Sequence, residues 1–114
     1  MKKLIFISII STTIYANYPE LLFNGNCITC HSTNQLNKSA PTIMEIKKEY
    51  LNAFPNKIDF INYMTTWVLS PKETTSIMSN AVKKYKLMPE LAYDKETLEE
   101  ISSYIYENDF KKTK

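Results

Sequence analysis

The sequence predicts an all-α protein, and three features of the chain carry that prediction. Apolar residues recur at helical spacing over residues 42–53, 56–69 and 77–86 and again beyond residue 94. Proline-containing breaks at Phe54-Pro55-Asn56, Ser70-Pro71 and Leu87-Met88-Pro89 separate these stretches. No stretch alternates apolar and polar residues as a half-buried strand does, and the sequence contains no repeat.

The helices are expected in the following order. Asn17 is placed to cap the first, with Pro19 in its first turn and Gly25 near its end. Residues 32–40 are polar and should form a loop, after which helices follow over 42–53 and, starting at Asn56, to Leu69. A fourth helix should run to about residue 86, with Pro71 as its opening residue.

Asp94 is the expected N-cap of the last helix, and Asp109 and Lys111 to Lys114 should form a polar tail. The fourth helix would bury a face that consists of Ile77, Met78, Ala81 and Tyr85. The last helix would bury a stripe that consists of Leu98, Ile101, Tyr104 and Ile105.

Residues 1–16 have the pattern of a secretory signal peptide. Lys2 and Lys3 provide the positive start, residues 4–10 the apolar run, and Ala16 a small residue at the expected cleavage point. The apolar run is short for a membrane span, and an uncleaved anchor is the alternative. Cleavage and export predict one periplasmic domain over residues 17–114.

The charge of that mature chain would be close to zero. The full sequence has 14 basic and 12 acidic residues, and the loss of Lys2 and Lys3 leaves 12 of each. A protein that binds nucleic acid through bulk positive charge is therefore disfavoured.

The chemistry-bearing residues are concentrated in the pentapeptide Cys27-Ile28-Thr29-Cys30-His31, which contains both cysteines and the single histidine. C-x-x-C-H is the attachment signature of c-type haem. The two thiols bond to the vinyl groups as thioethers, and the adjacent imidazole binds the iron. Two intervening residues allow a tight turn to present both sulfurs to one edge of the macrocycle. The motif therefore predicts one covalently attached haem c.

Three other interpretations of the motif are open. Cys27 and Cys30 could form a disulfide, or they could be a thiol–disulfide redox pair, although such pairs usually start a helix in a β-α-β unit. A structural zinc site usually needs four ligands, and the sequence has no further cysteine or histidine to complete one. The disulfide is the strongest of the three alternatives.

The mature chain resembles the class I monohaem cytochromes c, the small periplasmic kind found in bacteria. The resemblance rests on the helix that runs into the pentapeptide, on Ala40-Pro41 after it, and on Leu87-Met88-Pro89 before a final helix that contains Tyr104-Ile105-Tyr106. It covers nearly the whole mature chain and implies the cytochrome c fold, with four to five helices packed around the haem. The position before Leu87 that is usually glycine in the family is Lys86 here.

The resemblance also implies a ligand set. His31 would bind the iron through Nε2 and Met88 through Sδ from the opposite face, while the carbonyl of Pro41 would accept a hydrogen bond from Nδ1 of His31. Met88 lies where the helical periodicity lapses, and Pro89 favours an extended backbone there. The other methionines of the mature chain lie in periodic stretches and are expected to pack in the core: Met44, Met64 and Met78.

A haem ligated by histidine and methionine is suited to electron transfer, because the thioether raises the potential and no coordination site stays open for a substrate. The expected function is a periplasmic, non-enzymatic electron carrier. It would be a monomer that exchanges electrons with membrane or periplasmic redox enzymes of a respiratory chain. Two alternatives are a haem-based sensor that binds a small gas, and an electron-relay subunit of a larger oxidoreductase complex.

The haem would provide the centre of a small core, and the apo form is expected to be poorly folded. The residues expected to line the haem are Leu21, Leu22, Ile43, Ile46, Leu87, Leu98, Ile101 and Ile105. Four aromatic residues are either propionate ligands or, more simply, core aromatics with a polar tip: Tyr50, Tyr63, Trp67 and Tyr85. A basic cluster before Met88 is either a docking site for an acidic partner or a solvated helix face: Lys83, Lys84 and Lys86.

Overall fold

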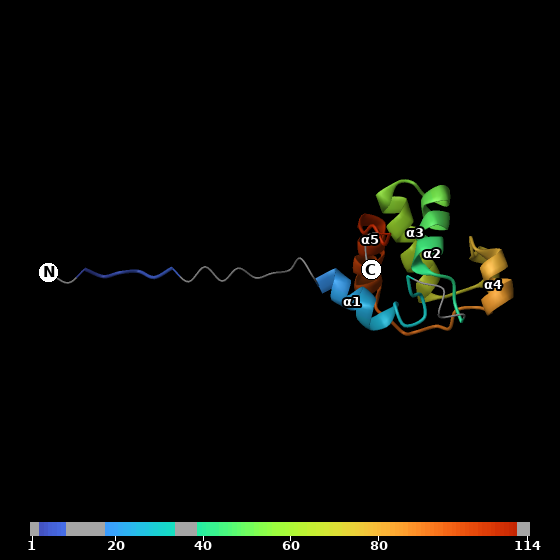
Figure 1. Cartoon of the computed structure of the whole chain (residues 1–114), viewed down its shortest axis with the longest axis horizontal. Helices are drawn as coiled ribbons and strands as arrows, with labels where there is room; N and C mark the ends of the chain where they lie inside the picture. The colour runs from blue at the N-terminus through green and yellow to red at the C-terminus, as the bar shows by residue number, and fades with distance from the viewer. Residues whose placement is uncertain (1–2, 9–17, 34–38, 112–114) are drawn as a thin grey trace.

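The computed structural model describes residues 3–8, 18–33 and 39–111, and all regular structure within them is helical (Figure 1). The elements are α1 (Tyr18–Asn26), α2 (Ile43–Ala53), α3 (Lys57–Leu69), a 3₁₀ turn η1 (Glu73–Thr75), α4 (Ser79–Tyr85) and α5 (Lys95–Glu107). The prediction of an all-α fold with four to five helices is therefore confirmed for the described residues.

Side-chain caps fix the starts of three helices. Thr42 precedes α2, Asn56 precedes α3 and Asp94 precedes α5, and a side-chain oxygen of each accepts a hydrogen bond from a backbone N–H in the first turn. The predicted starts at Asn56 and Asp94 are thus confirmed. The predicted cap of the first helix, Asn17, lies outside the described residues.

The prediction for the segment between α3 and α4 is wrong. Pro71 does not open a helix, and α4 begins only at Ser79. Ile77 and Met78 lie ahead of α4 in non-helical backbone, and both line a cavity. Their spacing mimics a helical face because several apolar side chains point into one space, and periodicity alone does not distinguish that arrangement from a helix.

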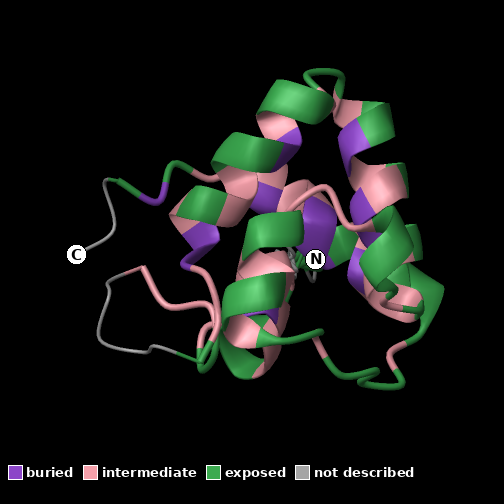
Figure 2. Ribbon diagram, turned by 90° about the vertical axis from the view of Figure 1, so that its right-hand side faces the viewer, coloured by how far each residue is buried: buried purple, intermediate pink, exposed green. Residues whose placement is uncertain are grey.

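The core lies between α1, α2, α3 and α5, and Figure 2 shows the buried residues on the faces that these helices turn toward one another. The packing of α5 against α3 is the most extensive, and α1 packs against α5 as well. Phe60 is fully buried, with its ring centroid 5.6 Å from that of Tyr50 and 5.2 Å from that of Tyr106. Edge-on aromatic pairs of this kind add to the energy of area burial.

Only one side of α1 is buried. Phe23 is 1% exposed and contacts the rings of Tyr104 and Phe110, whereas Leu21 is 67% exposed. Consecutive residues of a helix point about 100° apart, so Leu21, Leu22 and Phe23 cannot all lie on the buried face. Phe110 lies between residues of the predicted polar tail, and its burial is a feature that the sequence analysis missed.

The end of α5 is held by a lysine from α2. The ammonium of Lys47 donates to the carbonyl oxygen of Tyr106, at 2.9 Å, and to that of Asn108. These carbonyls lie at the C-terminal end of the helix, where a cation also interacts favourably with the helix dipole. The contact joins α2 to α5 across the core.

Residues 3–8 extend away from the helical body (Figure 1). The apolar side chains of Leu4, Ile5, Phe6 and Ile7 are each at least 80% exposed, so they take no part in the core. The rest of the predicted signal peptide, residues 1–2 and 9–16, lies outside the described residues. Within the described part of the chain, no helix is long and apolar enough to cross a membrane.

Candidate functional site

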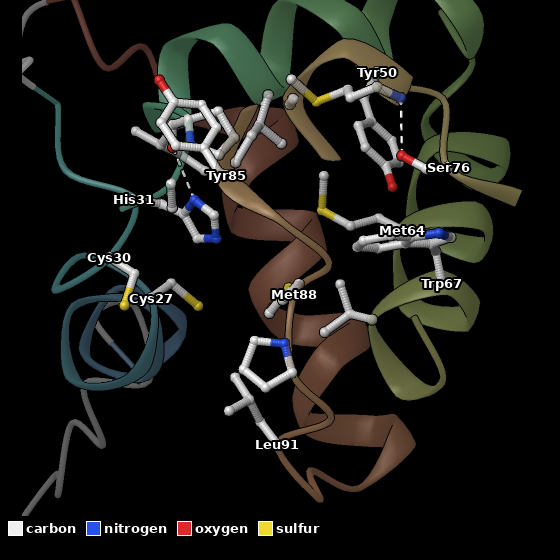
Figure 3. Close-up of a pocket in the computed structure, with 18 of the residues that line it drawn as sticks. Cys27, Cys30, His31, Tyr50, Met64, Trp67, Ser76, Tyr85, Met88 and Leu91 are labelled. Carbon is white, nitrogen blue, oxygen red and sulfur yellow. Dashed lines mark hydrogen bonds between the residues drawn. The ribbon is translucent and has the colours of Figure 1, made fainter. Parts of the chain in front are cut away.

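A cavity of about 390 Å³ lies between the helical core and the segment that carries α4 and residues 86–93 (Figure 3). This volume is within the range of ligand-binding cavities, roughly 300 to 1,000 Å³. No residue of α4 is buried, and its side chains Ala81, Val82 and Tyr85 line the cavity. The apolar lining from both walls consists of Ile43, Ile46, Met64, Val68, Ile77, Met78, Ala81, Val82, Leu87, Met88, Leu91, Leu98, Ile101 and Ile105.

Six of the eight residues predicted to line a haem lie on the wall of this cavity. Ile43, Ile46, Leu98, Ile101 and Ile105 come from α2 and α5, and Leu87 comes from the loop after α4; all of them line the cavity. Leu21 and Leu22 of α1, which were predicted with them, are not part of the cavity lining.

The helix α1 delivers the cysteine pentapeptide to one end of the cavity. The N–H of Cys27 bonds to the carbonyl of Phe23 at 2.8 Å, which continues the helical pattern beyond Asn26. The N–H of His31 then bonds to the carbonyl of Cys27 at 2.8 Å and closes a tight turn. This turn places Cys27, Cys30 and His31 on the cavity wall together.

The imidazole of His31 is oriented by the backbone. Its Nδ1 lies 2.8 Å from the carbonyl oxygen of Pro41, and because a carbonyl only accepts, Nδ1 carries the proton. Figure 3 shows the other ring nitrogen turned toward the cavity. Burial lowers the pKa of His31, and the bond to Pro41 offsets this in part. The neutral ring, with a lone pair free on Nε2, is the form that binds a metal.

The thiols of Cys27 and Cys30 are free, and Cys27 is half-buried while Cys30 is exposed. Burial, with a smaller contribution from Cys30, raises the pKa of Cys27 to about 11. An attacking thiolate needs a lowered pKa, so this environment disfavours Cys27 as the nucleophile of a thiol–disulfide exchange site. Free thiols are also the state that thioether formation requires.

A zinc site has no support in the structure either. Among residues 3–8, 18–33 and 39–111, no three side chains of histidine, cysteine, aspartate or glutamate come together as a metal site. A structural zinc ion needs four such ligands.

Met88 lines the cavity from the non-helical segment after α4, on a different wall from His31 (Figure 3). Two further methionines line the same cavity: Met64, which is 4% exposed on α3, and Met78. Met44 packs against the core, as predicted, and Met64 is both a core residue and a cavity residue. All five residues predicted for the site, with Pro41 and the two cysteines among them, line this one cavity.

The aromatic residues divide into two groups. Tyr50, Trp67 and Tyr85 line the cavity, whereas Tyr63 does not. The polar atoms of Trp67 and Tyr63 donate to backbone carbonyls, Trp67 Nε1 to Lys72 at 3.1 Å and the Tyr63 hydroxyl to Thr75. Burial raises the pKa of Tyr50, which keeps its hydroxyl protonated. For Tyr63 and Trp67, the interpretation as core aromatics with a paired polar tip is sufficient.

Lys86 has an unusual backbone. Its φ of 71° and ψ of 173° lie in a region that glycine adopts freely and other residues rarely do. Lys86 stands where the resemblance led us to expect glycine, and its backbone lies in a region that favours glycine.

Two residues of the cavity rim escaped the sequence analysis. Tyr93 donates from its hydroxyl to Oδ1 of Asn26 at 2.9 Å, and both side chains line the cavity. The two residues are 67 positions apart, and neither belongs to a motif, so no local signal could have paired them. Comparison with known proteins adds no assignment, because no family model, curated protein or solved structure matches this chain.

Proposed function

We propose that the cavity holds one haem, attached covalently through Cys27 and Cys30, and that the protein is a periplasmic carrier of single electrons. One observation carries the proposal. Two free thiols and an imidazole whose Nε2 faces inward meet at one end of an apolar cavity that also contains the thioether of Met88. Each of these groups has a defined task in holding a c-type haem.

The lining fits such a group. Most of its side chains are apolar, and in the described part of the chain no residue of α4 is buried. An apolar body in the cavity would therefore bury surface on both walls at once and join α4 to the rest of the domain. On the same basis we propose that the five helices form the cytochrome c fold and that residues 17–114 are one domain.

The residues of the chain would act as anchors and ligands. Cys27 and Cys30 would fix the group beside His31, whose ring is already held by the carbonyl of Pro41. His31 and Met88 would both bind the iron and leave no site on it for a substrate. The bound haem would supply an iron that gains and loses one electron, at a potential raised by the thioether. This combination suits a carrier and not a catalyst.

The proposed partners are redox enzymes of the membrane or the periplasm. Lys83, Lys84 and Lys86 are exposed at the end of α4, next to the cavity. A local positive charge there would attract an acidic partner and accelerate encounter. Measuring the rate of electron exchange with such a partner at increasing salt tests this point, because steering by exposed charges is screened.

Covalent attachment is tested by expressing the full chain with a haem-maturation system and determining the mass of the denatured product. The wild-type chain should retain one haem, and variants with Cys27→Ser or Cys30→Ser should lose at least one thioether bond. Thr29→Ala changes the same turn without removing a thiol and should retain the haem. A wild-type chain whose mass includes no haem, with a disulfide between Cys27 and Cys30, would overturn the proposal.

Carbon monoxide separates a carrier from a sensor. A reduced carrier, with His31 and Met88 both on the iron, should show no spectral change when the gas is added. A rapid shift of the reduced spectrum would favour the gas-binding alternative. Copurification with a larger complex at fixed stoichiometry would instead indicate a relay subunit.

A further inference from the structure

The loop that carries Met88 has few attachments to the rest of the domain. This Met88 loop, residues 86–93, contains no helix, and within the described part of the chain no backbone hydrogen bond joins it to another segment. Two of its residues, Lys86 and Ala92, have positive φ angles of 71° and 56°. Residues other than glycine rarely adopt such angles, so backbone preference does not hold the loop in place.

One side-chain contact does join the loop to the cysteine turn. The Tyr93 hydroxyl donates to Oδ1 of Asn26 at 2.9 Å, and Nδ2 of Asn26 donates to the carbonyl of Leu22 at 2.7 Å. The second bond orients the amide, because it commits Nδ2 to α1 and leaves Oδ1 to accept from Tyr93. Asn26 is the last residue of α1 and directly precedes Cys27. The Tyr93–Asn26 bond therefore links the loop that carries Met88 to the segment that carries Cys27.

We propose that Tyr93 and Asn26 are positioning residues that keep Met88 on the iron. The inference rests on the proposed function and adds to it a device that holds the sixth ligand. With the Tyr93–Asn26 bond in place, the C-terminal end of the Met88 loop is fixed to the segment that carries Cys27. Without this bond the loop is free to swing outward, and the thioether leaves the iron more often.

The energy of one hydrogen bond sets the size of the expected change in the affinity for imidazole. A competing ligand such as imidazole binds only when Met88 is off the iron, so its apparent affinity rises in proportion to the population of that open state. Loss of one neutral hydrogen bond should increase this population about two- to tenfold. The affinity of the ferric protein for imidazole should increase by the same factor.

The test is a titration of the ferric holoprotein with imidazole, followed by the loss of the far-red absorption band of sulfur-ligated iron. Tyr93→Phe removes only the hydroxyl and should bind imidazole about two- to tenfold more tightly than the wild type. Asn26→Ala should do the same. The affinity of the double variant for imidazole should be close to that of either single variant, because both substitutions remove the same hydrogen bond.

Tyr106→Phe is the matched control. The Tyr106 hydroxyl donates to the carbonyl of Pro55 at 3.0 Å, and Tyr106 does not line the cavity. This variant loses a comparable bond and should keep the wild-type affinity for imidazole. A purely structural role of Tyr93 would give the same pattern as this control.

The outcomes separate the two proposals. If the wild-type chain carries a low-spin haem and Tyr93→Phe binds imidazole as the wild type does, the positioning role is overturned and the carrier proposal stands. Additive effects of Tyr93→Phe and Asn26→Ala would also overturn the pairing. A wild-type chain without covalent haem would overturn both.

Discussion

Replacement of Lys86 by glycine should stabilise the holoprotein. A non-glycine residue in the conformation of Lys86, with φ 71° and ψ 173°, stores about 1–3 kcal/mol of strain. Glycine relieves the strain but adds about 0.4–1 kcal/mol of conformational entropy to the unfolded chain. The net gain is about 1 kcal/mol, which corresponds to about 4–8 °C in Tm for a domain of this size.

The assay is thermal unfolding of the purified holoprotein, followed by far-UV circular dichroism at fixed pH. Lys86→Ala is the matched control, because it removes the same charge and the same long side chain but keeps a Cβ atom. The alanine variant should therefore retain most of the strain and show no comparable gain. If Lys86→Gly is no more stable than Lys86→Ala, the backbone of Lys86 is not strained and the reasoning is refuted.

Three further predictions follow from the core, the cap of α5 and the cavity. Phe60→Ala should lower the free energy of unfolding by about 3–5 kcal/mol, since the ring is fully buried; a denaturation midpoint equal to that of the wild type would contradict this. Hydrogen bonds from Thr97 lower the pKa of Asp94, so its stabilising contribution is present above the ordinary value of 3.8 and is lost as the pH falls through the folded-state pKa. Asp94→Ala should accordingly lower Tm at neutral pH, and this difference from the wild type should shrink below about pH 4, whereas a constant difference would argue against the cap. A Cys27→Ala/Cys30→Ala variant without haem should unfold without a cooperative transition in calorimetry, because the cavity would lack its apolar occupant; a sharp, native-like transition would count against the proposed cofactor.

Much of the helical fold could be predicted from the sequence, because the signals were local. Asn56 and Asp94 cap the helices that the apolar spacing predicted, and the proline at position 55 interrupts the chain where it was expected to. The error at residues 71–78 has a physical cause. The apolar side chains of Ile77 and Met78 line the cavity. The spacing of apolar residues does not show whether they pack on a helix face or line a cavity.

The site was predictable to the extent that its residues lie in a compact motif. Cys27, Cys30 and His31 lie within one pentapeptide, and the contact between His31 and Pro41 spans only ten positions. The contact between Tyr93 and Asn26 spans 67 positions and depends on how the Met88 loop meets the end of α1. Met64 was predicted to be a core residue, and only the packing of α3 shows that it also reaches the cavity.

The central claim is tested most directly by the absorption spectra of the matured protein in its ferric and ferrous forms, with two variants alongside. Low-spin spectra of a c-type haem, with the weak far-red band of sulfur-ligated ferric iron, are the predicted result. The band should vanish in Met88→Ala and persist in Met64→Leu. The second substitution replaces another methionine of the cavity by a residue of similar volume. A band that persists in Met88→Ala and vanishes in Met64→Leu would contradict the assigned ligand, and a protein with no covalent haem at all would contradict the account itself.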